Sequence, residues 1–336
     1  MFIAWIKACT SDVYFSVCIN GSLEGFFNST NGLRQGCPLS PYLFSIVMDG
    51  LSNLIEEAIS NHSFNAISHG NSVISHLMYA DDLLLFGKAI TSNAHSLKTI
   101  FEVFGAVSGL LVNPLKSTVI FSKDSLQAAA FCDVLQIQKT TNPVTYLGLP
   151  IYHKMLRNSD FQPLIQNISG KLNGWYARTL SFAGRIQFLK YTICNTLAYW
   201  IRGAIIPKGC CKIINRICSR FLYFGNTELR KLHAISWNDT CLPKDCGGLG
   251  INSIDNLYHT FGCALIWRFL HSENLLFNWW RSKYCSFWKP ASGKTSLFGN
   301  ICVIWHKKLS IASLSQLGIT ATFRSFGTLG FKVLLL

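Results

Sequence analysis

Acidic residues are scarce in this sequence. The 336 residues include 16 Asp and Glu against 30 Lys and Arg, which gives a formal net charge of +14. Such an excess in a folded chain indicates a polyanionic partner, either a nucleic acid or an anionic membrane surface. The alternative is that the charge only keeps the protein soluble. Residues 151–245 hold 14 basic and 4 acidic side chains, so this one segment carries most of the charge.

Long apolar runs and a secretion signal are also missing. No window holds the ~18 uncharged apolar residues that a membrane-spanning helix needs. The apolar start, MFIAWIKAC, has no basic segment ahead of it and makes a poor signal peptide. The 13 cysteines are odd in number and show no disulfide framework, which favours a reducing compartment. We therefore expect an intracellular protein, nuclear or cytoplasmic and not secreted, with no membrane partner.

Internal repeats and low-complexity tracts are absent as well, and the length suggests about two domains. Strands are expected at residues 13–19 and 24–28, joined by Asn20-Gly21, a preferred type I′ hairpin pair. A helix is expected to begin with Ser40 as its N-cap and Pro41 in its first turn. A second helix, over residues 94–107, is expected to end at Gly109.

Short β segments separate and follow these helices: VISHLMYA, DLLLFG, STVIFS and YLGLPI. The order of elements predicts an α+β fold, with an antiparallel sheet that has helices on one face. After about residue 150 the composition shifts, and residues 155–224 have the pattern of a run of helices. We therefore divide the chain into residues 1–150, a basic helical segment at 151–245, and a C-terminal extension at 246–336.

Two adjacent carboxylates interrupt the apolar segment HLMYADDLLLF. Asp81 and Asp82 would repel each other at the mouth of a buried sheet, and a divalent cation would remove that repulsion. Mg²⁺ binds one or two carboxylates together with substrate phosphates. Two such ions, about 3.5–4 Å apart, can stabilise the attacking and leaving oxygens of a phosphoryl transfer. The alternative is an Asp-Asp turn in solvent, but YADD between two apolar β segments favours the metal site.

Six blocks of the chain, taken in order, resemble the reverse transcriptase of plant non-LTR (LINE-type) retrotransposons. They are INGSLEGFFNSTNGLRQGCPLSPYLF, HLMYADDLLLF, FGAVSGLLVNPLKSTVIF, YLGLPI, LNGWYARTLSFAGRIQFLKYTI and LPKDCGGLGI. The resemblance implies a right-hand polymerase fold, with an incomplete palm in residues 1–150 and a mainly helical thumb and connection in 151–245. It also implies an RNA-directed DNA polymerase that extends a DNA primer on an RNA template, with deoxynucleoside triphosphates and Mg²⁺ or Mn²⁺. Protein partners are not indicated.

The resemblance also implies roles for single residues. Asp81 would bind the catalytic metals and Asp82 would assist. Tyr79 would lie beside the primer end or the incoming nucleotide, and Lys116 near the nucleotide phosphates, although a solvated lysine is the alternative. Gly36 suits a pocket wall because a residue without a Cβ allows close approach. The residues implied to line the nucleotide and template pocket are Arg34, Gln35 and Gly36.

Basic side chains of the thumb would contact the phosphates of the nucleic-acid duplex. The four that the resemblance favours are Lys171, Arg178, Arg185 and Lys190. Contacts of this kind predict binding that weakens strongly with salt. The alternative is a set of ordinary solvated helix faces.

One part of the family pattern is not found. Family members carry a further metal-binding aspartate on an earlier palm strand, but only 12 residues precede Val13. Neither Asp12 nor Asp49 follows a β segment as that aspartate does, and the fingers and an upstream endonuclease are also not found. Because preorganised charge supplies much of catalysis, we expect the chain to be inactive or nearly so by itself. The alternative function is a non-catalytic nucleic-acid-binding remnant.

A zinc site is a minor alternative in the C-terminal half. Cys241, Cys246, His259 and Cys263 have the spacing C-x₄-C-x₁₂-H-x₃-C, and these ligand types suit tetrahedral zinc. The first pair departs from the usual C-x₂-C, and chance spacings are easy among 13 cysteines.

Overall fold

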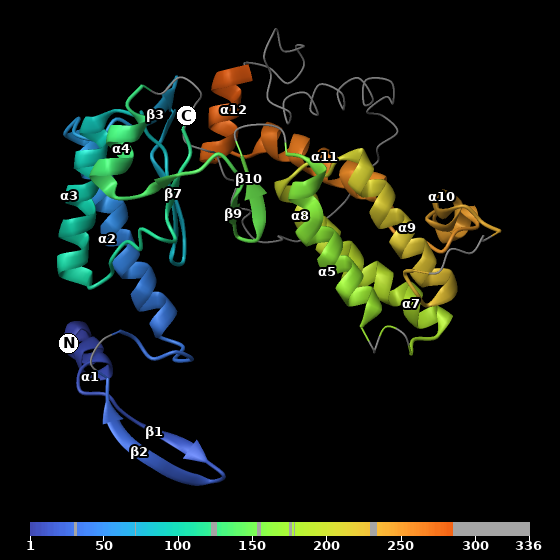
Figure 1. The fold of residues 1–336 in the computed structure, drawn as a ribbon, viewed down its shortest axis with the longest axis horizontal. Coiled ribbons are helices and arrows are strands. Elements are labelled where there is room, and N and C mark those ends of the chain that lie inside the picture. Colours follow the sequence, from blue (N-terminus) through green and yellow to red (C-terminus); the bar gives the residue numbers. More distant parts are fainter. Residues whose placement is uncertain are drawn as a thin grey trace.

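The computed structural model describes residues 1–29, 32–70, 72–121, 126–152, 156–174, 177, 179–228 and 234–284. Figure 1 shows the short strands and helices of residues 1–151 at one end of the molecule, and the helices α5 to α10 at the other. Within the described residues, no helix is long and apolar enough to cross a membrane.

The chain begins with α1 (Phe2–Thr10) and the hairpin of β1 (Tyr14–Ile19) and β2 (Ser22–Asn28). Both turn residues, Asn20 and Gly21, have positive φ angles of 51° and 90°, as a type I′ turn requires. The predicted hairpin is therefore confirmed. Nearly all of its residues are exposed, and it extends away from the rest of the protein (Figure 1).

The first long helix is α2 (Ser40–Ser60), with Pro41 in its first turn as predicted. Ser40 is not its N-cap, because the cap position belongs to Leu39. The Ser40 hydroxyl instead donates to the backbone carbonyl of Arg34 at 2.8 Å. It therefore holds the preceding loop against the helix start.

Four short strands lead from α2 to the next long helix. They are β3 (Ile67–His69), β4 (Ser72–Ile74), β5 (His76–Tyr79) and β6 (Asp82–Leu85). Helix α3 (Thr91–Ser108) follows and ends at Gly109, whose φ of 73° is left-handed, so the predicted C-terminus is confirmed. Helices α2 and α3 share a buried core that includes Leu51, Ile55, Leu97, Ile100 and Phe104.

A fully buried asparagine fixes the connections around these strands. The Asn93 side chain accepts a hydrogen bond from the Asn65 backbone N–H at 2.8 Å, and donates to the carbonyls of Asn65 and Lys88 at 3.0 and 2.9 Å. The Lys88 N–H also donates to the Asn65 carbonyl. The buried amide therefore has partners for both of its polar atoms, and it ties residues 65 and 88 to the start of α3.

The last elements of this part are short. They are β7 (Thr118–Val119), α4 (Ala128–Leu135), β8 (Gln138–Lys139), β9 (Val144–Tyr146) and β10 (Leu149–Ile151). The apolar pattern of YLGLPI indicated one strand, whereas the family resemblance implied a hairpin, and the segment crosses a hairpin turn. Its turn residues Leu147 and Gly148 have φ angles of 46° and 75°, and the reversal follows from these two left-handed residues.

The described strands form five separate two-stranded sheets. Four are antiparallel and one, β7–β8, is parallel. This mixture of helices and small sheets agrees with the α+β class, and α2, α3 and α4 lie together on one side of the strands β3 to β7 (Figure 1). One continuous antiparallel sheet is not formed, because the strands after β2 have only two to four residues each.

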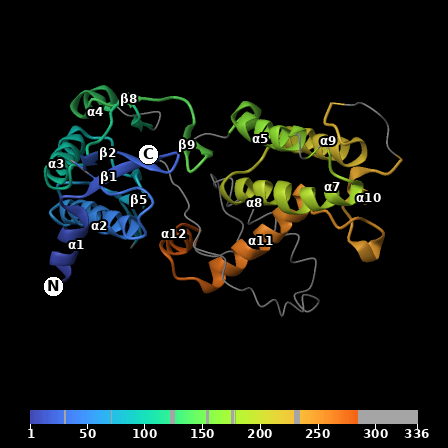
Figure 2. The ribbon, with the colours of Figure 1, turned by 90° about the horizontal axis from the view of Figure 1, so that it is seen from below.

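The run of helices predicted after residue 155 is confirmed. It contains η1 (Asn158–Phe161), α5 (Gln162–Asn173), α7 (Phe182–Phe188), η2 (Leu189–Ile193), α8 (Cys194–Gly203) and α9 (Lys208–Phe224). Figure 2 shows α5 and α9 in one layer and α7 and α8 in the next. Their shared core includes the completely buried side chains of Leu164, Ile168, Ile214, Phe221 and Leu222.

The described chain continues with α10 (Trp237–Thr240), η3 (Lys244–Cys246), α11 (Ile254–His271) and α12 (Leu275–Tyr284). Ile251, Ile254 and Leu257 pack in the same core as α5 and α9. That core therefore runs past residue 245, where the sequence suggested a boundary. The three sequence-based divisions stay predictions.

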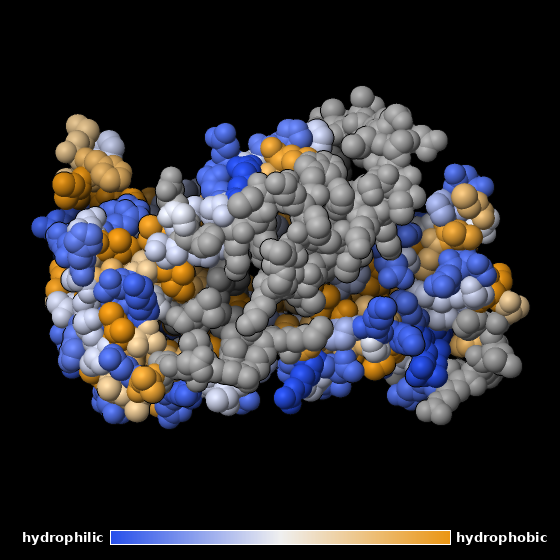
Figure 3. Space-filling model, turned by 90° about the horizontal axis from the view of Figure 1, so that it is seen from above, coloured by the Kyte–Doolittle hydropathy of each residue, from blue (hydrophilic) through white to orange (hydrophobic). Residues whose placement is uncertain are grey.

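Hydrophobic side chains also reach the surface. Orange patches are scattered over the left half of Figure 3, the end that holds α1 to α4. Exposed examples from these elements are Phe2, Trp5, Tyr42, Ile46 and Val107. Exposed apolar side chains also occur in the helical part, among them Tyr191, Ile213 and Trp267.

Candidate active site

The aspartate pair lies at the turn of the β5–β6 hairpin. Tyr79 pairs with Asp82 across the strands, so Ala80 and Asp81 form a two-residue turn. Ala80 has a φ of 51°, which is uncommon for a residue with a Cβ. The turn therefore places Asp81 and Asp82 at the end of the hairpin, next to a slightly strained backbone position, and the predicted hairpin with YADD at its tip is confirmed.

Hydrogen bonds join this hairpin to α2. The two ring nitrogens of His76 lie 2.8 Å from the Ser52 hydroxyl and 2.9 Å from the Ser75 hydroxyl. Burial lowers the pKa of His76, while the nearby Glu56 carboxylate raises it by a smaller amount. The neutral imidazole is therefore favoured at the base of the hairpin.

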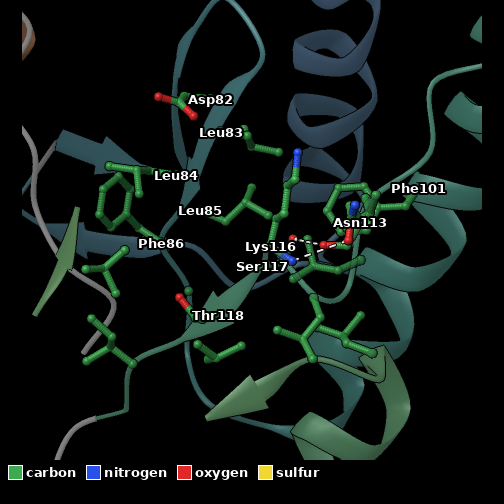
Figure 4. Close-up of a pocket in the computed structure, with 18 of the residues that line it drawn as sticks. Asp82, Leu83, Leu84, Leu85, Phe86, Phe101, Asn113, Lys116, Ser117 and Thr118 are labelled. Carbon is green, nitrogen blue, oxygen red and sulfur yellow. Dashed lines mark hydrogen bonds between the residues drawn. The ribbon is translucent and has the colours of Figure 1, made fainter. Parts of the chain in front are cut away.

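A cavity of about 580 Å³ begins at the aspartate pair. Asp81, Asp82 and Lys116 all line it, so the structure brings together three of the residues singled out from the sequence. Figure 4 shows Asp82 at the end of the hairpin and the Lys116 side chain extending toward the same end. Lys116 lies in an exposed turn just before β7, where its backbone N–H donates to Asn113.

The rest of the cavity wall is mostly apolar. It is contributed by α2, β6, α3, β7 and the β9–β10 hairpin, through residues that include Met48, Leu83, Phe101, Val119 and Ile151. An apolar wall with a few polar groups at one end is typical of a ligand site. The chemistry of this site is therefore concentrated at the hairpin tip.

Tyr146 was not singled out from the sequence, yet it lines the same cavity as Asp82. Burial raises the pKa of Tyr146, and the negative charge of Asp82 raises it further. Tyr146 is the first residue of the YLGLPI block. That block is therefore the feature of the sequence from which Tyr146 could have been predicted as a cavity residue.

The predicted pocket residues of the 32–39 loop do not line this cavity. Arg34, Gln35 and Gly36 are exposed, and the Arg34 guanidinium lies 5.9 Å from the ring of Phe15 on β1. Gly36 has a φ of 81° and no atom within 4 Å of where a Cβ would stand. The described structure thus requires glycine there for its backbone angle. Tyr79 is 63% exposed at the hairpin tip and does not line the cavity either.

The basic residues predicted to contact duplex phosphates have different surroundings. Lys171 is exposed and donates to the Thr196 hydroxyl at 2.8 Å, and Lys190 is half-buried beside Gly250. Arg185 instead donates to the carbonyls of Leu180 and Leu222. Its guanidinium therefore joins segments within the helical part, and its contact with duplex phosphates stays a prediction. Arg178 lies outside the described residues.

The four candidate zinc ligands are not brought together. Cys241 is buried in the core, Cys246 is exposed on η3, and His259 and Cys263 lie one turn apart on α11 with 3.7 Å between Nδ1 and Sγ. Among the described residues, no group of three or more His, Cys, Asp or Glu side chains could hold a metal ion. The zinc alternative is therefore wrong for this structure, because Cys241 takes a core position.

Comparison with known proteins agrees with the resemblance seen at the aspartate hairpin. Residues 1–151 match the model of the reverse transcriptase (RNA-dependent DNA polymerase) family. This part of the chain is therefore similar to reverse transcriptases. The match ends at β10, so it contains the hairpin, the cavity and Lys116, and leaves the helices from η1 onward outside.

Three relatives extend this finding. The 149 kDa protein of transposon TX1 from Xenopus laevis is 24% identical over 278 residues, which are 81% of this chain and 20% of the relative. The Pol polyprotein of a type-1 retrotransposable element R2 from Popillia japonica is 31% identical over 116 residues, 34% of this chain and 18% of the relative. A putative ribonuclease H protein of Arabidopsis thaliana is 26% identical over 128 residues, which are 38% of this chain and 21% of the relative. The chain spans about a fifth of the length of each of these relatives.

Proposed function

We propose that this chain is the palm and thumb part of an RNA-directed DNA polymerase from a LINE-type retrotransposon of the kind found in plants. In the complete enzyme it would extend a DNA primer on an RNA template with deoxynucleoside triphosphates. The observation that supports this most directly is the placement of Asp81 and Asp82 at a hairpin tip, at the same cavity as Lys116. The match of residues 1–151 to the reverse transcriptase family supports it independently.

The residues at the tip suit a divalent cation. Asp81 and Asp82 offer adjacent carboxylate oxygens, the donors that Mg²⁺ or Mn²⁺ prefers. When bound there, such a metal would neutralise phosphate charge and lower the pKa of the attacking primer hydroxyl. Lys116 would add positive charge near the nucleotide phosphates. Tyr79, exposed at the tip, would offer its ring to the primer end or to the incoming base.

We further propose that the chain is inactive or nearly so by itself. The described residues place two carboxylates at the site and no third metal-ligating group beside them. Charge that is not preorganised around the reacting phosphate loses most of its catalytic effect. The same observation favours a second candidate, a nucleic-acid-binding protein without catalysis that uses the basic residues of 151–245.

Metal binding and primer extension by the purified chain test both proposals. We expect Mn²⁺ to bind, as measured by electron paramagnetic resonance, and Asp81→Asn to weaken that binding about tenfold or more. Asp49→Asn is the matched control, because Asp49 is an exposed carboxylate on α2. In an assay with an RNA template, a DNA primer and Mg²⁺, we expect no extension.

The outcomes separate the claims. Extension that Asp81→Asn abolishes would disprove inactivity while strengthening the polymerase assignment. Mn²⁺ binding that is the same in wild type, Asp81→Asn and Asp82→Asn would remove the metal site. Nucleic-acid binding without metal binding or extension would favour the second candidate.

A further inference from the structure

Helix α12 brings the chain back to the part of the molecule that carries the aspartate hairpin. It follows α11 of the helical part, yet it packs on β3 and β4. A Cβ at Gly70, the residue directly after β3, would lie 3.3 Å from the Cβ of Ser282 on α12. Figure 1 shows α12 between α11 and β3. The last described helix therefore contacts strands from early in the sequence.

An arginine of α12 holds it to the end of α11. The Nε and Nη2 atoms of Arg281 donate to the Phe269 carbonyl at 3.2 and 2.8 Å, and Nη2 also donates to the Ser272 carbonyl. Its Nη1 atom donates to the Asn278 side chain at 2.9 Å. The last carbonyls of a helix have no partner within that helix, and a positive charge beside them is favourable. Arg281 therefore caps α11 from the neighbouring helix.

A small apolar core joins the same two helices. Phe277 of α12 is buried with Ile266 and Phe269 of α11. The rings of Phe277 and Phe269 meet edge-on with 6.4 Å between their centres, and Trp280 meets Phe277 in the same way at 5.9 Å. Edge-on pairs of this kind add stability beyond the area they bury. Helices α11 and α12 therefore form one packed unit.

This unit is anchored in the helical part through α8. The Arg202 guanidinium, near the end of α8, lies 4.5 Å from the centre of the Phe261 ring on α11. The Tyr258 hydroxyl of α11 accepts a hydrogen bond from the backbone N–H of Ile206 at 2.6 Å. Leu257 packs in the core shared with α5 and α9. The position of α12 is therefore tied to that of α8.

Helix α8 makes its own contact with residues 1–151. Gly203, at its end, packs so closely on β10 that a Cβ there would clash with the Leu149 side chain. One turn earlier, the Tyr199 hydroxyl donates to the backbone carbonyl of Leu147. The helical part thus touches residues 1–151 at β9–β10 through α8 and at β3–β4 through α12. Attachment at two separate hairpins restricts a rotation that a single attachment would allow.

We propose that α12 is a strap that fixes the orientation of the helical part relative to the aspartate hairpin. Only Ser75 separates β4 from β5, so the strap is attached to the same segment that carries Asp81 and Asp82. Arg281 fastens it, because its hydrogen bonds run from α12 to carbonyls of α11. When the strap is released, the helical part is free to rotate about the contact between α8 and β10. The strap consists of contacts within the chain and does not depend on the polymerase function proposed above.

Distance measurements on the full chain test the strap. Spin labels at Glu102 on α3 and Lys212 on α9, both exposed, report the separation of the two parts by double electron–electron resonance. Encoded non-natural residues should carry the labels, because the chain has 13 cysteines. We expect one narrow distance distribution in the wild type and a broad one in Arg281→Gln. The matched control is Arg216→Gln, at an exposed arginine of α9, and it should keep the narrow distribution.

A second variant acts at the other end of the strap. Ser282→Tyr places a large side chain where α12 meets Gly70, while it leaves Arg281 and the apolar core of α11 and α12 in place. It should broaden the distribution as Arg281→Gln does. Ser60→Tyr, at an exposed residue that ends α2, is its control and should not.

The outcomes decide for or against the strap. Distributions that are equally narrow in the wild type, Arg281→Gln and Ser282→Tyr would overturn it, and so would a broad distribution in the wild type. If Arg281→Gln lowers the helical circular dichroism signal, the comparison of Ser282→Tyr with Ser60→Tyr decides. A chain that extends no primer but shows the expected broadening leaves the strap supported.

Discussion

The two hairpins of the N-terminal half are built in opposite ways. The β1–β2 hairpin has long strands and a turn, Asn20-Gly21, whose residues suit their positive φ angles, but almost no side chain in it is buried. The β5–β6 hairpin has four-residue strands and a turn that forces Ala80 to a φ of 51°. Most of its other residues are half-buried, and it is hydrogen-bonded to α2 through His76.

This contrast separates two sources of hairpin stability. The first hairpin is favoured by its own turn and strand residues, whereas the second is held by packing that overrides an unfavourable turn residue. Strained backbone is tolerated where the surrounding structure determines it, and such positions gather at functional sites. The aspartate pair lies in the hairpin that is held by packing.

The largest effect should come from removing a packed side chain next to β6. Phe86, 1% exposed, ends that hairpin, whereas Phe26 on β2 is 77% exposed. We expect Phe86→Ala to lower the free energy of unfolding by about 3–5 kcal/mol, and Phe26→Ala to change it by less than about 0.5 kcal/mol. Urea titration followed by circular dichroism measures both. If Phe26→Ala lowered the free energy of unfolding more than Phe86→Ala, the conclusion that packing holds the second hairpin and not the first would be wrong.

The turn residues should show smaller effects of opposite sign. Ala80→Gly removes the positive-φ strain and should stabilise the protein by about 0.5–1 kcal/mol, after allowing for the flexibility of glycine. Gly21→Ala introduces the same strain in a position with open space around it, so it should weaken its hairpin by about 1 kcal/mol. Hydrogen exchange of the backbone amides in the strands measures the local stability of each hairpin separately. If Ala80→Gly increases exchange in β5 and β6, the turn is not strained.

The smallest effect should be a pH dependence from His76. Burial lowers the pKa of His76 in the folded protein, so below about pH 6.5 the unfolded chain gains a proton that the folded chain resists. Stability should therefore fall as the pH drops from about 6.5 toward the folded pKa, and it should be unaffected by this group at higher pH. In His76→Asn, stability should change less with pH below about 6.5 than in the wild type. Thermal unfolding, with Tm measured between about pH 5 and 8, tests this. His62→Asn, at an exposed residue with a φ of 57°, is the control and should leave the slope as in wild type.

Local signals in the sequence predicted local structure well. Asn20-Gly21, Pro41 and Gly109 act through the conformations of one or two residues, and the structure has each feature where it was expected. The conclusion that YADD lies at a hairpin tip followed from the apolar segments on both sides. A continuous sheet could not be predicted reliably, because pairing between short strands depends on neighbours far away in the sequence.

Side-chain roles were harder to predict than backbone features. Arg185 and Arg202 are both arginines on helices of the basic segment, and nothing next to them in the sequence distinguishes them. The Arg185 guanidinium donates to two backbone carbonyls, whereas the Arg202 guanidinium lies 4.5 Å from the centre of the Phe261 ring. Leu147 likewise gives no sign in the sequence of its left-handed backbone, or of the hydrogen bond that its carbonyl accepts from the Tyr199 hydroxyl. These outcomes depend on which helices pack together.

The Asn93 amide closes the segment that carries the aspartate hairpin. Strands β3 to β6 all lie between Asn65 and Lys88, and this one side chain hydrogen-bonds to the backbone at both ends of the segment. Between its ends the segment is held by the hydrogen bond between His76 and Ser52 and by packing against the core of α2 and α3. Transplanting residues 65–88 into another protein would therefore require a recipient that offers both the buried amide and the apolar face of these two helices.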